Sequence, residues 1–516
     1  MSDAVTIRLL PLDVSFAAER GSSLRASLAA HGVDLPCGGA RACGGCGVRV
    51  LNGSPAATAW DRDVFSRAEL ANGWRLACRM RAEADLLLDV GDTAAPVLTD
   101  ESPIAGWRRQ GLGVAIDVGS TTIAAQLIDR ASGAILGVRT GLNPQMAHGA
   151  EVMSRVRFAL GSRDLTDAIR RFLGDMVSDL AAGREIAEVV LVGNTVMHHL
   201  FCGLDVEPLS HVPFASPAMG EQRFRSADLG WSLSDAALIR FLPCLGGFVG
   251  SDILAGVVAV DLCRDDALRA LIDLGTNGEI ALGNRDRVLV ASTAAGTAFE
   301  AGCIHNGMRA ANGAIAHVTA NTDGRLDCEV IGGGPPQGIC GSGLVDAVAS
   351  GLILGRILPS GKIVDDSRIF PVTGDIALRQ ADVRELQLAK GAIAAGLRIL
   401  LKHWGASMAD IQTLYLAGAF GNYLEVDSAR RIGLLECPSQ VVAVAGNTAL
   451  RGAKQILVGK PLPVATDVRH VMLAADADFE DLFVSCMRFP ALEMDEGRLC
   501  QRRSKIASLS GAKMHQ

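Results

Sequence analysis

The sequence predicts an α/β protein of about three domains, in which a small cysteine-containing domain precedes a larger, internally duplicated one. The chain of 516 residues is 49% hydrophobic but only 4% aromatic, and it contains 58 glycines. That balance is typical of aliphatic, turn-rich α/β proteins. Two patterns set the order of the domains. Four cysteines near the N-terminus are spaced C-x5-C-x2-C-x31-C, and a strand-and-turn motif containing an aspartate occurs twice, 156 positions apart.

The four cysteines, Cys37, Cys43, Cys46 and Cys78, are candidate ligands of one metal cluster. Thiolates ligate iron–sulfur clusters, and four of them complete one [2Fe–2S] centre. Glycines between the first three let the backbone wrap a cluster without side-chain collisions. A zinc site, which favours two C-x2-4-C pairs, is the alternative. Disulfides are disfavoured, because the thirteen cysteines are scattered and no secretory signal precedes them. The pattern therefore favours an iron–sulfur cluster.

The residues around these cysteines are expected to form a small sheet. Residues 4–17 predict two short strands, residues 22–31 a short helix, and residues 48–53 a strand that ends in a turn. Over about residues 3–92 the sequence resembles plant-type ferredoxin domains of the β-grasp fold, and it matches their cluster loop at all four cysteines. The resemblance implies an electron-transfer domain.

Charge and hydropathy exclude several classes of partner. The formal net charge is −7 and the chain has no block of basic residues, so nucleic acid is not expected as a partner. No apolar run approaches the roughly eighteen residues of a membrane span, so no membrane association is expected. The N-terminus lacks the basic and apolar regions of a signal peptide. A reducing cytoplasm suits both the scattered thiols and an oxygen-sensitive cluster.

The repeated motif is a candidate phosphate-binding turn. A hydrophobic strand runs into Asp117, Gly119 and three hydroxyl residues, and a second strand runs into Asp273, Gly275 and a Thr-Asn-Gly-Glu sequence. An aspartate at a strand end can hold a Mg²⁺-bound water, and a tight turn of glycine and hydroxyl residues presents backbone amides to phosphate oxygens. No Walker P-loop occurs in the chain. The alternative is that these glycines only close hairpins in another α/β fold.

A second repeat supports the duplication. Residues 188–195 and 413–422 each predict a buried strand that ends in a Gly/Asn turn, so the order strand, turn, strand, helix, strand occurs once in each half. This order resembles the acetate and sugar kinase/heat-shock cognate/actin superfamily, whose two RNase H-like domains clamp ATP. The resemblance implies a first phosphate loop, a second phosphate loop and an adenosine-side turn. The cofactor-binding residues it implies are Gly119, Ser120, Thr121, Thr122, Gly275, Thr276, Asn277, Gly278, Gly418 and Gly421.

The fusion of the two parts resembles one family, the ATP-dependent reductive activators of corrinoid proteins. Family-like segments run in order over about residues 4–455, and Thr297 departs from them where proline is expected. These segments are residues 143–145, 193–199, 295–300, 307–310, 338–346, 384–390 and 446–450. The resemblance implies an ATP-hydrolysing enzyme that passes one electron from the [2Fe–2S] cluster to inactive Co(II) and regenerates Co(I). It implies Mg²⁺ with the ATP, Asp117 and Asp273 near the metal, and Glu279 or Glu300 positioning the hydrolytic water.

The implied partners are a corrinoid protein of a methyltransferase system and an external electron donor, and a homodimer is plausible for the family. Two alternatives remain: a small-molecule kinase, or an ATP-gated regulatory module, each with a redox-sensing ferredoxin domain. The expected domain organisation has five parts. These are a [2Fe–2S] ferredoxin-type domain at 1–92, a linker at 93–112, two RNase H-like ATPase subdomains at 113–245 and 246–490, and a flexible tail at 491–516.

Overall fold

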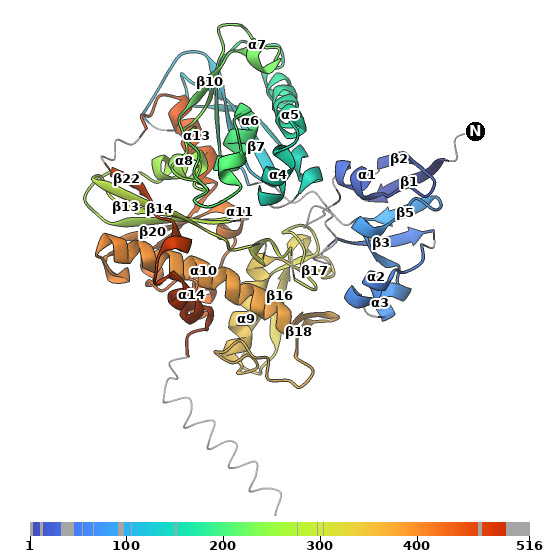
Figure 1. Cartoon of the computed structure of the whole chain (residues 1–516). Coiled ribbons are helices and arrows are strands. Elements are labelled where there is room, and N and C mark those ends of the chain that lie inside the picture. The colour runs from blue at the N-terminus through green and yellow to red at the C-terminus, as the bar shows by residue number, and fades with distance from the viewer. Residues whose placement is uncertain are drawn as a thin grey trace, which may run out of the picture.

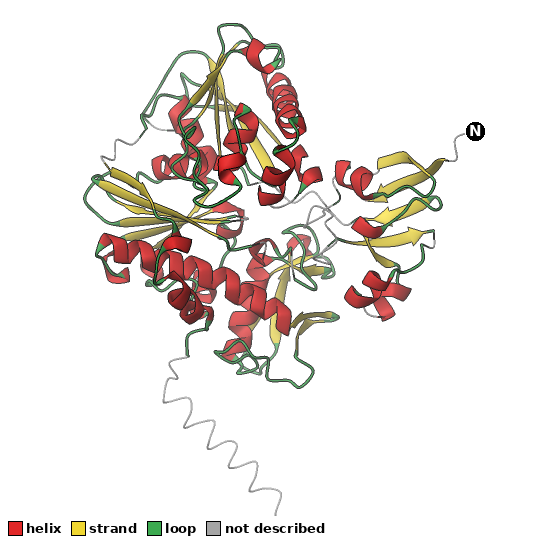
Figure 2. Cartoon of the chain, in the orientation of Figure 1, coloured by secondary structure: helices red, strands yellow, loops and turns green. Residues whose placement is uncertain are grey.

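A computed structural model describes residues 4–10, 14–31, 33, 46–53, 55–65, 67–90, 98–104, 106–149, 152–275, 277–296, 298–302, 304–462 and 467–491. Cys37, Cys43, Thr276 and Thr297 lie outside the described residues, as does the expected tail beyond residue 491. A small N-terminal domain lies beside two lobes, each built on a six-stranded sheet (Figure 1). Figure 2 shows the sheets as separate groups of strands with helices packed around them.

The N-terminal domain is a five-stranded mixed sheet in the order β2-β1-β5-β3-β4. Its central strands β1 and β5 are parallel, and β1 buries Val5, Ile7 and Leu9 on one face while the intervening residues point to solvent. The two strands and the helix expected near the N-terminus are confirmed. The elements are β1 (Ala4–Leu10), β2 (Val14–Glu19), α1 (Arg25–Ala30), β3 (Gly47–Asn52), α2 (Ala59–Val64), α3 (Arg67–Ala71), β4 (Trp74–Leu76), η1 (Ala77–Arg79) and β5 (Leu86–Asp89).

The first lobe is built on the sheet β10-β11-β9-β6-β7-β8. Strands β6 and β7 form the expected antiparallel hairpin with Asp117 opposite Ala124, and β9 pairs parallel to β6. The elements are β6 (Leu112–Val118), β7 (Thr122–Asp129), β8 (Ile135–Leu142), η2 (Pro144–His148), α4 (Val152–Ala159), α5 (Asp164–Ala181), β9 (Ile186–Gly193), α6 (Thr195–Cys202), η3 (Glu207–Leu209), β10 (Gln222–Phe224), α7 (Ser226–Leu229) and β11 (Leu238–Phe241).

The second lobe repeats this arrangement in the sheet β21-β20-β12-β13-β14-β22. Strands β12 and β13 form the second expected hairpin, with Asp273 opposite Glu279, and β20 pairs parallel to β12. The sheet elements are β12 (Arg269–Leu274), β13 (Gly278–Gly283), β14 (Arg287–Thr293), β20 (Thr413–Ala417), β21 (Val442–Gly446) and β22 (Asp467–His470).

Two small sheets and several helices complete the second lobe, and the long helix α10 packs on β13 and β14. They are η4 (Ala298–Glu300), β15 (Ala314–Ala320), β16 (Leu326–Val330), η5 (Ile331–Gly333), β17 (Gly338–Ile339), α9 (Gly341–Ile353), β18 (Ile369–Thr373), β19 (Ile376–Arg379), α10 (Gln380–Trp404), η6 (Met408–Asp410), α11 (Gly418–Gly421), α12 (Val426–Arg431), η7 (Ser439–Val441), η8 (Leu473–Ala475) and α14 (Phe479–Met487).

Two helices, α8 (Ser251–Ala259) and α13 (Thr448–Leu457), lie between the two large sheets (Figure 1). Helix α13 packs against α8 and against β6 and β9 of the first sheet, although it follows the last core strand of the second. Its Leu450 and Leu457 share one apolar cluster with Val190 and Val192 of β9. The two lobes are therefore joined by packed helices rather than by a loop alone.

Described residues of the N-terminal domain contact both lobes. Helix α1 packs against η2 of the first lobe, and the Glu69 carboxylate lies 3.9 Å from the His305 ring of the second lobe. No helix in the described part of the chain is both long enough and apolar enough to cross a membrane.

Candidate nucleotide site and redox centre

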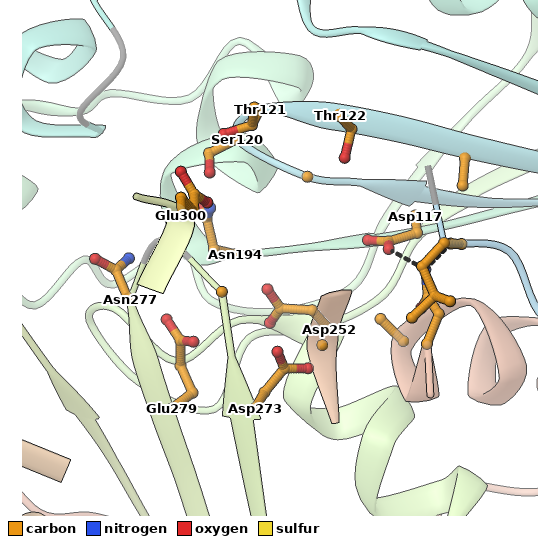
Figure 3. A pocket seen from close by; sticks show the side chains of 17 residues that line it. Asp117, Ser120, Thr121, Thr122, Asn194, Asp252, Asp273, Asn277, Glu279 and Glu300 are labelled. Carbon is orange, nitrogen blue, oxygen red and sulfur yellow. Dashed lines mark hydrogen bonds between the residues drawn. The ribbon is translucent and has the colours of Figure 1, made fainter. Parts of the chain in front are cut away.

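The turns of the two hairpins face each other across a cavity of about 160 Å³ between the lobes (Figure 3). Asp117 ends β6 and Asp273 ends β12, so the duplicated hairpins bring two equivalent carboxylates to one place. The lining residues are Leu98, Asp117, Gly119, Ser120, Thr121, Thr122, Ala124, Asn194, Asp252, Asp273, Gly275, Asn277, Glu279, Glu300, Gly418, Asn447 and Ala449.

The first turn is held closed by its backbone and by Asn143. A Cβ atom on Gly119 would lie 2.4 Å from the Thr122 carbonyl oxygen, so only glycine fits this turn. The Asn143 side chain donates to the Gly119 carbonyl at 2.9 Å, and the Asn143 N–H donates to the Thr121 carbonyl at 2.9 Å. These contacts fix the hydroxyl residues of the turn at the edge of the cavity (Figure 3).

The second turn leaves open space where the first is tight. The Gly275 N–H donates to the Asn277 carbonyl at 3.1 Å. Among the described residues, a Cβ atom on Gly275 would meet only that oxygen and Asp273 Oδ1, at 3.8 and 3.9 Å. The space beside Gly275 is thus a cradle that a side chain would fill. Gly418 closes the same corner with φ +85°, and a Cβ atom there would lie 2.5 Å from Asp273 Oδ1.

Two of the glycines expected at the cofactor lie outside this lining. A Cβ atom on Gly278 would collide with Thr293 Oγ1 at 2.7 Å and with Ile393, so close packing between β13, β14 and α10 requires that glycine. Gly421 faces Leu416 at ordinary contact distance. The other described residues of the expected set all line the cavity.

Four acidic side chains line the cavity: Asp117 on the side of the first hairpin, and Asp252, Asp273 and Glu279 opposite it (Figure 3). Burial raises the pKa of Asp117 to about 6, although the hydrogen bond from Asn447 acts to lower it. Burial, with the nearby Asp117 charge, raises the pKa of Asp273 to about 7. Burial and the neighbouring aspartates raise the pKa of Asp252 to about 8, and they raise the pKa of Glu279 as well.

The donor set suits a hydrated divalent cation. Among the described lining residues there is no lysine or arginine, so nothing in the lining compensates the acidic charges. Within the described chain no three His, Cys, Asp or Glu side chains converge closely enough to ligate a metal directly. Mg²⁺ retains several waters and usually takes one or two carboxylates together with substrate phosphates. Asp117 and Asp273 therefore fit water-mediated contacts to Mg²⁺ in a Mg²⁺–nucleotide complex.

Sequence reasoning missed Asp252, which reaches the cavity from the first turn of α8. A Cβ atom on Gly250 would lie 2.2 Å from the Gly193 carbonyl, and the Ser251 hydroxyl donates to that carbonyl at 3.2 Å. This close approach pins the start of α8 to the β9 turn. The Gly-Ser-Asp sequence before an apolar helix was the available signal, since an acidic residue in a first turn is common at helix starts.

Asn447 belongs to a segment with family resemblance, but its role emerges only in the structure. Its Oδ1 caps α13 by accepting from the Leu450 N–H at 2.8 Å. Its Nδ2 donates to Asp117 Oδ2 and to the Leu98 carbonyl, each at 3.0 Å. Asn194, which follows the C-terminal end of β9, caps α6 by accepting from the Met197 N–H at 3.0 Å. Each lobe thus places an asparagine cap at the cavity.

Two of the four expected cluster ligands, Cys46 and Cys78, lie next to each other in the described part of the chain. Cys46 and Cys78 are both 3% exposed, and the Cys78 N–H donates to Cys46 Sγ at 3.5 Å. The Ala77 N–H donates to the Cys46 carbonyl at 2.8 Å, which ties the two ligand segments together. Buried thiols with a backbone donor at sulfur suit thiolate ligands of an iron–sulfur cluster, whose potential depends on such hydrogen bonds. The other two expected ligands lie outside the described residues.

Other reactive-looking side chains are part of the core. His198 and His199 on α6 are fully buried, and the His199 ring bonds Ser216 Oγ at 2.8 Å and the Thr195 carbonyl at 2.9 Å. Burial raises the pKa of the Cys202 thiol, which keeps it protonated. Cys340 is also buried, at the start of α9, and its thiol donates to the Ile315 carbonyl at 3.3 Å.

Three family models cover almost the whole chain. Residues 7–83 match the 2Fe-2S iron-sulfur cluster binding domain, residues 112–265 the RACo middle region, and residues 267–499 the C-terminal domain of RACo, the ASKHA domain. The chain is 35% identical over 415 residues to the corrinoid activation enzyme RamQ of Eubacterium limosum, a match that covers 72% of this chain and 69% of that protein.

Two further similar proteins also have corrinoid proteins in their names. The [Co(II) methylated amine-specific corrinoid protein] reductase of Methanosarcina barkeri is 26% identical over 420 residues, which cover 72% of this chain and 76% of that protein. The solved structure of a reductive activator for corrinoid, iron-sulfur protein aligns with a TM-score of 0.65 and 26% identity, over 94% of this chain and 98% of that one. The chain therefore belongs to the RACo family, with a [2Fe–2S] cluster binding domain ahead of the RACo middle region and ASKHA domain.

Proposed function

We propose that this protein is an ATP-dependent reductive activator that returns one electron from its [2Fe–2S] cluster to Co(II) of a corrinoid methyltransferase protein and so regenerates Co(I). The observation that carries the proposal is the acidic cavity between the duplicated hairpins, in the same chain as a cluster-binding domain. In this proposal the cavity binds the ATP on which the reaction depends, and the cluster domain supplies the electron. The relatives named as a corrinoid activation enzyme and a corrinoid protein reductase support the cobalt substrate.

Energetics explain why an electron carrier would be joined to an ATPase. Plant-type clusters have potentials near −400 mV. For a one-electron step, each ~59 mV of uphill difference lowers the equilibrium constant tenfold. Co(II) in a corrinoid protein is harder to reduce than such a cluster, so the reduction needs a second source of free energy. Hydrolysis of ATP to ADP and phosphate supplies it by changing how the corrinoid protein is bound while the electron passes.

The residues of the cavity take distinct roles in this proposal. Asp117 and Asp273 hold the hydrated Mg²⁺, and the turns at Gly119 and Gly275 present backbone N–H groups to the phosphates. When bound, Mg²⁺ neutralises phosphate charge and orients the terminal phosphoryl group. Gly418 lies on the adenosine side, and Glu279 or Glu300 orients the attacking water.

An external electron donor reduces the cluster before each turnover, and the corrinoid protein docks where one electron can leave it. We place this reaction in the cytoplasm, because its reducing conditions suit the described cysteines, none of which is in a disulfide. A homodimer is proposed on the family resemblance alone.

The decisive experiment is anaerobic. Reduced, cluster-loaded protein is mixed with a Co(II) corrinoid protein encoded near its gene, and Co(I) absorbance is followed with and without Mg·ATP. Formation of Co(I) only with Mg·ATP supports the proposal. Complex formation without a change in cobalt oxidation state, across several corrinoid proteins, would favour the regulatory module. ATP turnover stimulated by a sugar or carboxylate would favour the kinase.

A further inference from the structure

Residues 98–104, here called the strap, lie between the ferredoxin domain and β6, inside the segment expected to be a linker. The strap is anchored rather than free: Asp100 is 4% exposed and Ile104 is 7% exposed. Ile104 packs in the same apolar cluster as Leu457 of α13. The only covalent path from the cluster-binding domain to the ATPase lobes therefore runs through a segment that is itself part of the ATPase packing.

Strand β7 and helix α13 hold the strap by hydrogen bonds. The Asp100 carbonyl accepts from Gln126 Nε2 of β7 at 2.9 Å and from Lys454 Nζ of α13 at 2.6 Å. The Asp100 carboxylate accepts from Arg451 Nε at 3.0 Å and from the Ser102 N–H at 2.8 Å. Buried, charge-assisted bonds of this kind are among the stronger contacts in proteins. They fix the strap against α13.

One side chain joins the strap to the catalytic cavity. Asn447 Nδ2 has two N–H groups; one donates to the Leu98 carbonyl of the strap and the other to Asp117 Oδ2, each at 3.0 Å. Its Oδ1 is occupied by the Leu450 N–H. Every hydrogen-bonding group of this amide therefore has a partner. If the amide moves with the Asp117 carboxylate, its hydrogen bond to the Leu98 carbonyl must change as well. Leu98 itself lines the cavity.

We propose that Asn447 is a positioning residue that couples occupancy of the metal–nucleotide site to the strap, and through the strap to the tether of the ferredoxin domain. This inference rests on the proposed function and adds the part of the chain through which nucleotide binding reaches the redox domain. A ligand that fixes the Asp117 carboxylate favours the state in which Asn447 bridges Asp117 and Leu98. Binding and strap order are then linked, and the linkage is reciprocal.

The test is hydrogen–deuterium exchange of the full-length, cluster-loaded protein, with no corrinoid protein present. The probe is Mg²⁺ with a nonhydrolysable ATP analogue at saturation, established separately by calorimetry. In the wild type, exchange of peptides covering residues 98–104 is expected to slow about fivefold on binding, which corresponds to about one hydrogen bond. In Asn447→Asp the slowing should fall below about twofold. Aspartate keeps the cap on α13 but cannot donate to Leu98, so the comparison separates the bridge from the cap.

A second variant keeps the proposal testable if Asn447→Asp fails to bind nucleotide. Arg451→Gln removes the ion pair between Arg451 and Asp100 of the strap and leaves the weaker one from Lys454 to Asp100. Asn447 and Asp117 stay in place, and Arg451 does not line the cavity. Reciprocity predicts that Arg451→Gln weakens binding of the Mg²⁺–nucleotide analogue about fivefold.

Three results would overturn the coupling: no change of strap exchange in the nucleotide-bound wild type, an equal change in Asn447→Asp, or unaltered nucleotide affinity in Arg451→Gln. Failure of the wild type to form Co(I) would overturn the proposed function instead, because these readouts involve neither cobalt nor electron transfer.

Discussion

The carboxylates that line the cavity favour binding of a cation. Asp117 and Asp273 lie at the ends of equivalent strands, and the described lining offers them no lysine or arginine. Their charge is therefore available to a cation that arrives with the nucleotide.

Replacing Asp273 with asparagine tests this directly. Asp273→Asn should lower ATP-dependent Co(I) formation on the order of 100-fold, because it removes preorganised charge at the metal. Asp117→Asn should behave in the same way. The visible spectrum of the cluster should stay unchanged in both variants. Asp266→Asn, an exposed aspartate away from the cavity, is the matched control. Persistent ATP-dependent reduction in both cavity variants would place the nucleotide elsewhere.

The two glycines at the second turn should respond differently to a methyl group. Gly275→Ala places its methyl in open space at the cavity, so it should raise the dissociation constant of Mg·ATP about tenfold and leave the free energy of unfolding unchanged. Gly418→Ala forces alanine to φ +85° against Asp273, so it should lower the free energy of unfolding by about 2 kcal/mol or more. Calorimetric titration and urea unfolding distinguish the two effects. Equal destabilisation by both substitutions would contradict the assignment of Gly275.

Local sequence was enough for some site residues and not for others. Asp117 and Asp273 could be predicted because each belongs to a short strand-and-turn motif whose geometry is local. Asp252 and Asn447 reach the cavity only because α8 and α13 pack between the sheets, which depends on contacts far apart in the sequence. Gly278 shows the opposite case, since a glycine in the motif serves strand packing rather than the cavity.

At the scale of elements, helix α10 carries a buried charge with a consequence for pH. Lys390 is 1% exposed and its Nζ donates to the Arg488 carbonyl at 2.6 Å. Burial lowers the pKa of Lys390 to about 8, below the ordinary lysine pKa of about 10.4. The unfolded chain therefore binds this proton more tightly than the folded one. The stability that the neutral amine provides is complete above the unfolded pKa and is lost as pH falls through 8.

Lys390→Met should remove this dependence. The free energy of unfolding of the wild type, relative to that of the variant, should rise by up to about 3 kcal/mol between pH 8 and pH 10.4. Urea unfolding followed by circular dichroism at both pH values measures the difference. Parallel pH profiles for the two proteins would show that the amine is charged in the folded state throughout.

The hairpins could be predicted from the sequence, whereas the anchoring of the strap could not. The hairpins β6–β7 and β12–β13 could be predicted, because apolar strands that end in Asp-x-Gly have a strong local pattern. The strap has no periodicity, and it is held by Gln126, Arg451 and Lys454 from distant segments. A segment that is anchored mainly by residues remote in sequence looks like a linker until those residues are in place.

For the whole molecule, the N-terminal domain has its own core, and the contacts that its described residues make with the lobes are small. Its buried cluster draws all of its residues from 5–88. The Glu69–His305 pair is partly exposed, and pairs of this kind contribute about 0–1 kcal/mol. Core formation therefore does not require the ATPase.

Residues 1–97 expressed alone should fold and show the visible spectrum of the full-length protein. Any Co(II) reduction by this fragment should be independent of ATP, because the acidic cavity is absent. Absorbance and circular dichroism spectra of the fragment, with the full chain as reference, test the expectation. A fragment that cannot hold the cluster would mean that the lobes complete the cluster environment.

The placement of α13 also determines when the first lobe can finish folding during translation. Strand β6 ends at Val118 and α13 ends at Leu457, a difference of 339 positions. A Cβ atom on Gly113 of β6 would lie 2.7 Å from the Leu457 side chain, and Arg130 Nε donates to the Leu457 carbonyl at 3.1 Å. At ordinary translation rates this apolar face of the first sheet stays uncovered for roughly 17 to 70 seconds. An apolar face that stays uncovered over that interval is prone to aggregation, so the yield of folded protein should depend on elongation speed.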